Sequence, residues 1–176
     1  MSIRQQGGVF GRNPVFNSIE ASQWVGVPRN VASYGVQSGV TGTTDETTLA
    51  TITLPAGSMG ANGWIRLRTQ TSQTNNANNK IFKIYMGGEE VINSTAGYTS
   101  SSTTARITQV WNRNAENSQV TGAKSANDDP GESGATLTTF AVDTSADVTI
   151  LITGRLADGA DELNLEAYSL EVCYIA

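Results

Sequence analysis

Runs of alternating apolar and polar residues, separated by turn-forming residues, constrain the fold of this chain more than any other feature. Ala50, Ile52 and Leu54 alternate with Thr51 and Thr53, and a stretch rich in Pro and Gly follows. A period of two places successive side chains on opposite faces of a strand. Similar runs cover residues 31–37, 64–70, 81–86, 91–92, 104–111, 136–142, 148–156 and 163–175. We therefore expect eight or nine strands and no helix.

The composition favours the same fold class. Thr, Ser, Asn and Gln make up 60 of the 176 residues, and Thr suits strands while Ser and Asn suit turns. So many strands must stack or close to bury one face. The sequence predicts an all-β protein, an antiparallel β-sandwich of the jelly-roll type. The dipeptides Gly87-Gly88 and Asp158-Gly159 predict hairpin turns, because positive φ costs little there.

Residues 1–30 differ from the rest and are predicted to be an extended N-terminal arm, with the sandwich over residues 31–176. Gly and Pro interrupt short apolar pieces in this arm, without a sustained period. Its apolar side chains are too many for a freely solvated tail, so we expect the arm to lie on a surface. The first ten residues lack the features of a signal peptide, and no apolar run approaches the roughly 20 residues that span a bilayer. We expect synthesis in a cytosol and no membrane contact.

Several classes of chemistry are disfavoured by composition. The chain has no histidine, the commonest general base and metal ligand near neutral pH. Its net charge is −5, which argues against general binding of nucleic acid. The single Cys173 lies in the last strand run and is expected to be a small packing residue. The expected protein is not an enzyme and needs no cofactor.

Three weaker site hypotheses remain open at this stage. The acidic loop 127–132 could hold Ca²⁺, although Pro130-Gly131 makes it look like an ordinary turn. Trp64, Trp111, Tyr85 and Tyr98 could form a platform for sugars, or could simply pack. Arg66, Arg68, Lys80 and Lys83 are expected to form the densest basic patch, facing either solvent or a neighbouring copy. Residues 72–79 and 112–133 are predicted to be long polar loops.

Three segments resemble proteins of tailed bacteriophages. GGVFGRNPVFNSIEAS, residues 7–22, resembles the N-terminal attachment segment of phage tail fibres and tailspikes. GANGWIRLRTQTSQTNNANNKIFKIYMGG, residues 60–88, and WNRNAENSQ, residues 111–119, resemble small jelly-roll proteins of phage virions. Together the segments cover about a third of the chain. Unlike a long tail fibre, the chain has neither heptads nor a β-helical repeat between arm and body.

The resemblance implies a virion protein, assembled in the host cytoplasm and displayed on the particle. The expected function is that of a homotrimeric capsid decoration, cement or head-fibre protein that contacts the major capsid protein. The residues expected to anchor the arm are Phe10, Arg12, Pro14, Phe16 and Trp24.

Two alternatives accompany this expectation. In the first, the chain is a tail fibre or tail knob protein whose arm docks on a tail adaptor and whose loops touch a host receptor or glycan. The residues expected to make that contact are Asn76, Asn79, Trp111 and Asn114. The second is a polysaccharide depolymerase, which the missing histidine and the short chain disfavour.

Overall fold

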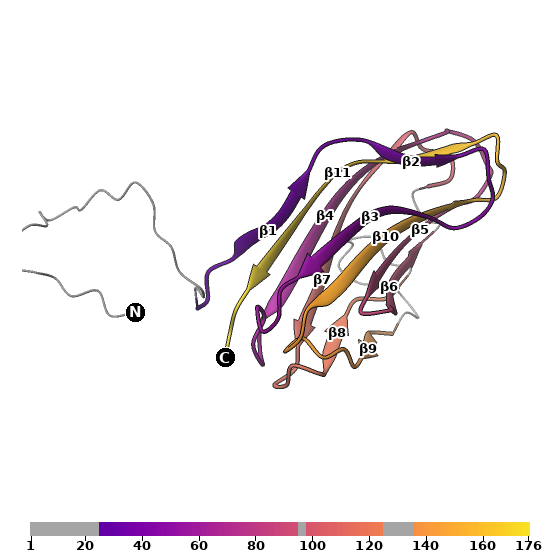
Figure 1. Cartoon of the computed structure of the whole chain (residues 1–176). Helices are drawn as coiled ribbons and strands as arrows, with labels where there is room; N and C mark the ends of the chain where they lie inside the picture. Colours follow the sequence, from indigo (N-terminus) through magenta and orange to yellow (C-terminus); the bar gives the residue numbers. More distant parts are fainter. Residues whose placement is uncertain (1–24, 95–97, 125–135) are drawn as a thin grey trace, which may run out of the picture.

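The computed structural model describes residues 25–94, 98–124 and 136–176, which fold into strands and connections without a helix (Figure 1). All the named strand pairs are antiparallel. The strands are β1 (Arg29–Tyr34), β2 (Ser38–Thr41), β3 (Thr47–Leu54), β4 (Trp64–Gln73), β5 (Lys80–Met86), β6 (Glu89–Ser94), β7 (Thr103–Asn112), β8 (Gln119–Thr121), β9 (Thr138–Phe140), β10 (Val148–Leu156) and β11 (Glu162–Cys173).

Two sheets pack face to face. The larger has seven strands in the order β1-β11-β4-β7-β8-β9, with β2 also paired to β11, and the smaller has the order β3-β10-β5-β6. The predicted all-β class and antiparallel sandwich are confirmed. Strand periodicity explains the core: in β4, Ile65 and Leu67 are buried while Arg68 is exposed. The largest fully buried apolar side chains include Phe82, Leu54, Met86, Ile150, Ile152, Leu156, Leu163 and Leu170.

The two predicted hairpins differ in their turns. Gly87 and Gly88 both have positive φ, 57° and 88°, and form a two-residue connection between β5 and β6 as predicted. Asp158 and Gly159 instead connect β10 to β11, which lie in different sheets, so the hairpin predicted here is wrong, and neither residue has positive φ. The connection between β10 and β11 has five residues, and Asp161 N donates to Asp158 O at 3.0 Å. Because this connection crosses from one sheet to the other, it does not need the tight two-residue turn that joins paired strands.

The ends of the sandwich carry different segments. At the first, here called the terminal end, Val25 pairs with Tyr174 and Trp64 lies opposite both Cys173 and Trp111. At the other, here called the loop end, Leu163 lies opposite Gln73 and the connections 74–79 and 157–161 adjoin one another. Figure 1 shows β1 beginning beside the C-terminus.

Candidate functional site

The residues expected to anchor the arm, Phe10, Arg12, Pro14, Phe16 and Trp24, lie outside the described residues. The structure does fix the point from which residues 1–24 continue. Val25 forms a parallel bridge with Tyr174, and Gly26 N donates to Tyr174 O at 2.9 Å. The arm therefore joins the body at the terminal end.

Asn76 lies at the loop end, in a network around a fully buried lysine. Lys80 Nζ donates to Asn76 Oδ1 at 2.5 Å and to the Asn78 carbonyl at 3.0 Å. The Asp161 carboxylate lies 3.7 Å from the same nitrogen and accepts from the Asn76 and Asn78 amides at 2.6 and 3.0 Å. Burial alone would raise the pKa of Asp161, but these amides and the Lys80 charge lower it. The network ties the 74–79 connection to Lys80 at the start of β5 and to Asp161 in the connection between β10 and β11.

Asn79 is exposed in the same connection. Its carbonyl accepts from Ala157 N at 2.9 Å, which fixes its backbone. Of the two asparagines predicted here, Asn76 turns its amide inward and Asn79 is available to solvent.

Trp111 and Asn114 lie near the terminal end instead. Trp111 is 39% exposed on the outer face of the seven-stranded sheet, directly opposite Trp64 across the β4-β7 pair. Arg66 lies over the Trp64 ring at 5.4 Å and pairs with Glu171 at 2.6 Å. Asn114 is exposed and has a left-handed φ of 55° in the connection after β7. The four predicted contact residues therefore divide between the two ends of the body and do not form one site.

The predicted basic patch of Arg66, Arg68, Lys80 and Lys83 is wrong. Arg66 and Arg68 lie on the outer face of the seven-stranded sheet, and Lys80 is buried. Lys83 projects from β5 in the other sheet. Charges that are close in sequence are separated because consecutive strands β4 and β5 belong to different sheets.

Lys83 belongs to a polar cluster on the outer face of the four-stranded sheet. Its ammonium lies 3.0 Å from Glu46 and 3.5 Å from Glu90, and it donates to the Tyr85 hydroxyl at 3.1 Å. Hydrogen bonding to Glu46 and Tyr85 raises the pKa of Lys83. Burial raises the pKa of Glu46, but donors from Lys83, Thr153 and Tyr85 outweigh it and lower that pKa overall. The charged groups of this cluster pair with one another, which is typical of a structural ion-pair network at a surface.

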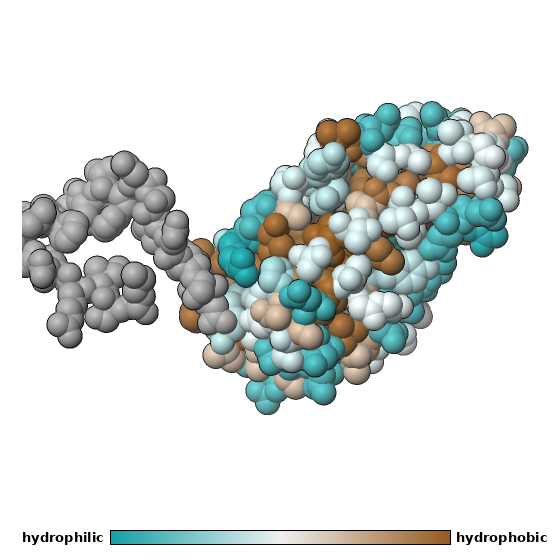
Figure 2. Space-filling model, viewed as in Figure 1, coloured by the Kyte–Doolittle hydropathy of each residue, from teal (hydrophilic) through white to brown (hydrophobic). Residues whose placement is uncertain are grey.

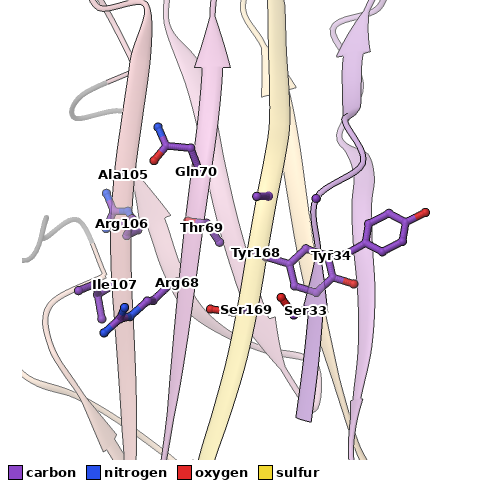
Figure 3. Close-up of a pocket in the computed structure, with 12 residues that line it drawn as sticks. Ser33, Tyr34, Arg68, Thr69, Gln70, Ala105, Arg106, Ile107, Tyr168 and Ser169 are labelled. Carbon is purple, nitrogen blue, oxygen red and sulfur yellow. The ribbon is translucent and has the colours of Figure 1, made fainter. Parts of the chain in front are cut away.

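A shallow groove crosses the larger sheet between β1 and β7 (Figure 3). Its volume is about 610 Å³, and small residues such as Ser33, Ala105, Ala167 and Ser169 lie along it. Arg68 and Ile107 approach each other at one side in Figure 3, while Tyr34 lies at the other. The rings of Tyr34 and Tyr168 are 6.1 Å apart between centroids. The sequence alone does not predict this groove. It forms where small outward-facing residues lie side by side on neighbouring strands, and their alignment depends on the register.

The other residues considered for chemistry lie in the core or outside the described residues. Cys173 is buried, and burial raises the pKa of its thiol. The acidic loop 127–132 lies outside the described residues. Within the described ranges, no group of three or more His, Cys, Asp or Glu side chains is arranged to hold a metal ion. Nor does the described part of the chain contain a helix long and apolar enough to cross a membrane.

Comparison with known proteins gives no family assignment. No family model matches the chain, and no curated protein matches it. Among solved structures, the chain is similar to dimeric latent PorU from Porphyromonas gingivalis, with a TM-score of 0.35 and 8% sequence identity. The match covers 86% of this chain and 14% of the PorU chain.

Proposed function

We propose that this chain is a non-enzymatic structural protein of a tailed-bacteriophage virion, a capsid decoration, cement or head-fibre protein anchored by its N-terminal arm. The basis is the resemblance of residues 7–22, 60–88 and 111–119 to phage virion proteins. Under this proposal the body is a jelly roll, and the strand order supports that reading. Strands β2, β11, β4 and β7 lie in one sheet and β3, β10, β5 and β6 in the other, a division that fits two Greek keys.

The structural observation that carries the proposal is the difference between the two ends of the body. Residues 1–24 join at the terminal end through Val25, beside Tyr174. Three side chains at this end, Val25, Val27 and Ile175, are exposed and apolar. At the loop end, Asn79 is exposed in the 74–79 connection, and Asn76 ties that connection to Lys80 and Asp161. An anchored arm would direct the terminal end toward the particle and the loop end outward.

Under this proposal, the arm attaches to the particle by burying its apolar side chains. A standard protein interface covers about 1,600 Å², and apolar arm residues of the predicted anchor would contribute its core. If the body is the expected homotrimer, three linked arms would raise the effective concentration of each and strengthen attachment. A shell protein held in this way stiffens the capsid lattice.

The double variant Phe10→Ala/Phe16→Ala tests the anchor. We expect this variant to fold with the wild-type circular dichroism spectrum. It should no longer co-sediment with phage particles that lack the native protein, because both side chains belong to the predicted anchor. Leu137→Ala, an exposed apolar truncation in the body, is the matched control and should still bind. Retained particle binding by the double variant would contradict the anchor assignment.

The second candidate function is a tail fibre or tail knob protein that binds a host receptor or glycan. The observation favouring it is the asparagine-rich 74–79 connection at the end opposite the arm, which Lys80 holds through Asn76 and Asn78. Asn79→Ala changes an exposed amide there while leaving the backbone bond to Ala157 possible. Weaker adsorption of phage to host cells with this variant would support the tail function, and unchanged adsorption would oppose it.

A further inference from the structure

At the loop end, a fully buried lysine lies against the side-chain amide of an asparagine. The Lys80 side chain is 0% exposed, and its nitrogen is 2.5 Å from Asn76 Oδ1. Because a C=O bond is about 1.2 Å long, this nitrogen lies no more than about 3.7 Å from the amide carbon, Asn76 Cγ. Oriented groups react from separations of about 3–3.5 Å. The lysine nitrogen is therefore placed close to a carbon that an amine can attack.

The surroundings of Lys80 contain a group that can take its proton. Lys80 lies opposite Leu156 in the β5-β10 pair and shares the core face of β5 with Phe82, and both of these side chains are buried. The Asp161 carboxylate is 3.7 Å from the lysine nitrogen. Transfer of one proton from Lys80 to Asp161 removes two buried charges at once. It also gives the lysine the lone pair that a nucleophile needs.

The amide of Asn76 is held on both sides by groups that such an attack requires. Asn78 N donates to Asn76 Oδ1 at 3.0 Å, where negative charge develops during the attack. Asp161 Oδ1 accepts from Asn76 Nδ2 at 2.6 Å, so an acid lies against the leaving nitrogen. Asn76 is half-buried, and Figure 2 shows hydrophilic residues at the loop end, toward the upper right of the view. A nucleophile, an oxyanion donor and an acid therefore meet at one amide close to solvent.

We propose that Lys80 Nζ and Asn76 Cγ become joined by an intramolecular isopeptide bond, with Asp161 as the acid and base. Asp161 takes a proton from the Lys80 ammonium, and the lone pair of the neutral amine forms the bond to Cγ while the C=O electrons move to Oδ1. Asp161 then returns the proton to Nδ2, the C=O bond re-forms, and the Cγ–Nδ2 bond breaks with its electrons on the nitrogen, which leaves as ammonia. The excess proton on the new amide nitrogen passes through Asp161 to the ammonia, which becomes ammonium. No oxidant, reductant or cofactor takes part.

The product fits the same network. The new amide N–H replaces the ammonium and can donate to Asp161, and Asn76 Oδ1 still accepts from Asn78 N. The bond closes only residues 76–80, a short segment, so it constrains little of the unfolded chain. Replacing Lys80 removes contacts from the loop end in both the linked and the unlinked form. The bond does not depend on the virion function proposed above.

Mass spectrometry of the denatured full chain tests this bond. We expect wild type to be lighter than its sequence mass by one ammonia. Trypsin should release residues 69–83 as one peptide that lacks one ammonia, because acylated Lys80 is no longer a cleavage site. An unlinked chain gives residues 69–80 and 81–83 instead. Fragmentation of the larger peptide then locates the link between Asn76 and Lys80.

Three variants separate the bond from the fold. Lys80→Arg keeps the positive charge but removes the amine, and it should have its full sequence mass. Asp161→Asn keeps both partners of the bond but removes the acid and base, so linkage should slow at least about 100-fold. Asn79→Ala changes an exposed amide in the same connection, and this matched control should be linked as wild type is. Far-ultraviolet circular dichroism verifies that each variant is folded.

Three results would overturn the inference. The first is a wild type of full sequence mass. The second is a loss of ammonia confined to residues 30–66, where Asn62-Gly63 can cyclise on its own with the same change in mass. The third is an Asp161→Asn variant that is folded and linked as completely as wild type. Particle binding does not enter any of them, so this inference and the proposed function can fail separately.

Discussion

Replacing Lys80 by methionine removes the buried ammonium at the loop end while keeping most of the side-chain volume. Lys80 Nζ donates to Asn76 Oδ1 and the Asn78 carbonyl, and lies 3.7 Å from Asp161 Oδ2. Removing one member of a buried ion pair costs about 3–5 kcal/mol, because the other polar groups stay buried. Here Asp161 retains its hydrogen bonds from Asn76 and Asn78. We therefore expect the lower limit, about 3 kcal/mol.

Urea unfolding measures this loss directly. The midpoint should shift to lower urea with an unchanged slope, and the melting temperature should fall by about 6–12 °C for a domain of this size. Lys124→Met is the matched control, because Lys124 is 44% exposed and its pair with Glu90 spans 3.6 Å. An exposed pair of this kind contributes at most about 1 kcal/mol. If Lys80→Met is no more destabilising than Lys124→Met, the reasoning about the buried network is refuted.

The Glu46 cluster predicts acid sensitivity, and Cys173 predicts protection from reagents. Since the folded-state pKa of Glu46 lies below its ordinary value of 4.5, its stabilising contribution is present above pH 4.5 and lost as pH falls through the lowered value. The difference in unfolding free energy between wild type and Glu46→Gln should therefore shrink below pH 4.5, and a constant difference across that range would disprove the linkage. Cys173, 2% exposed with a raised thiol pKa, should react with a thiol reagent only as fast as the protein unfolds. Fast labelling of the folded protein would show that the terminal end opens locally.

Much of the strand pattern could be predicted from period-two runs. In the run at residues 148–156, Val148, Ile150 and Ile152 share the buried face as the alternation indicates. Strands β2 and β8 were not predicted, because Ser38–Thr41 and Gln119–Thr121 are short and contain one valine each. Both become strands by pairing with longer neighbours, β11 and β7, which local sequence does not reveal.

The buried lysine was the main error in the candidate site, although a signal for it existed. Lys80, Phe82, Ile84 and Met86 have the same parity in β5, so the alternation places Lys80 on the core face. Because lysine is almost never fully buried without a partner, the sequence alone favours a surface position for Lys80 despite this alternation. Its partner, Asp161, lies far along the chain and comes close only because β10 pairs with β5.

The division of Asn76 and Trp111 between opposite ends could not be predicted from the sequence either. It depends on the register of the β4-β7 pair, in which Trp64 lies opposite Trp111 and Ser72 opposite Thr103. Alternation assigns each residue to a face, but only register assigns it to an end.

Determining the copy number and position of this protein on purified phage particles tests the central claim most directly. Quantitative gel analysis would give the copy number, and cryo-electron microscopy would give the position. A capsid decoration protein predicts hundreds of copies at regular positions on the shell, with the terminal end facing the capsid. A handful of copies at the tail would favour receptor binding instead, and absence from the particle would contradict the virion function altogether.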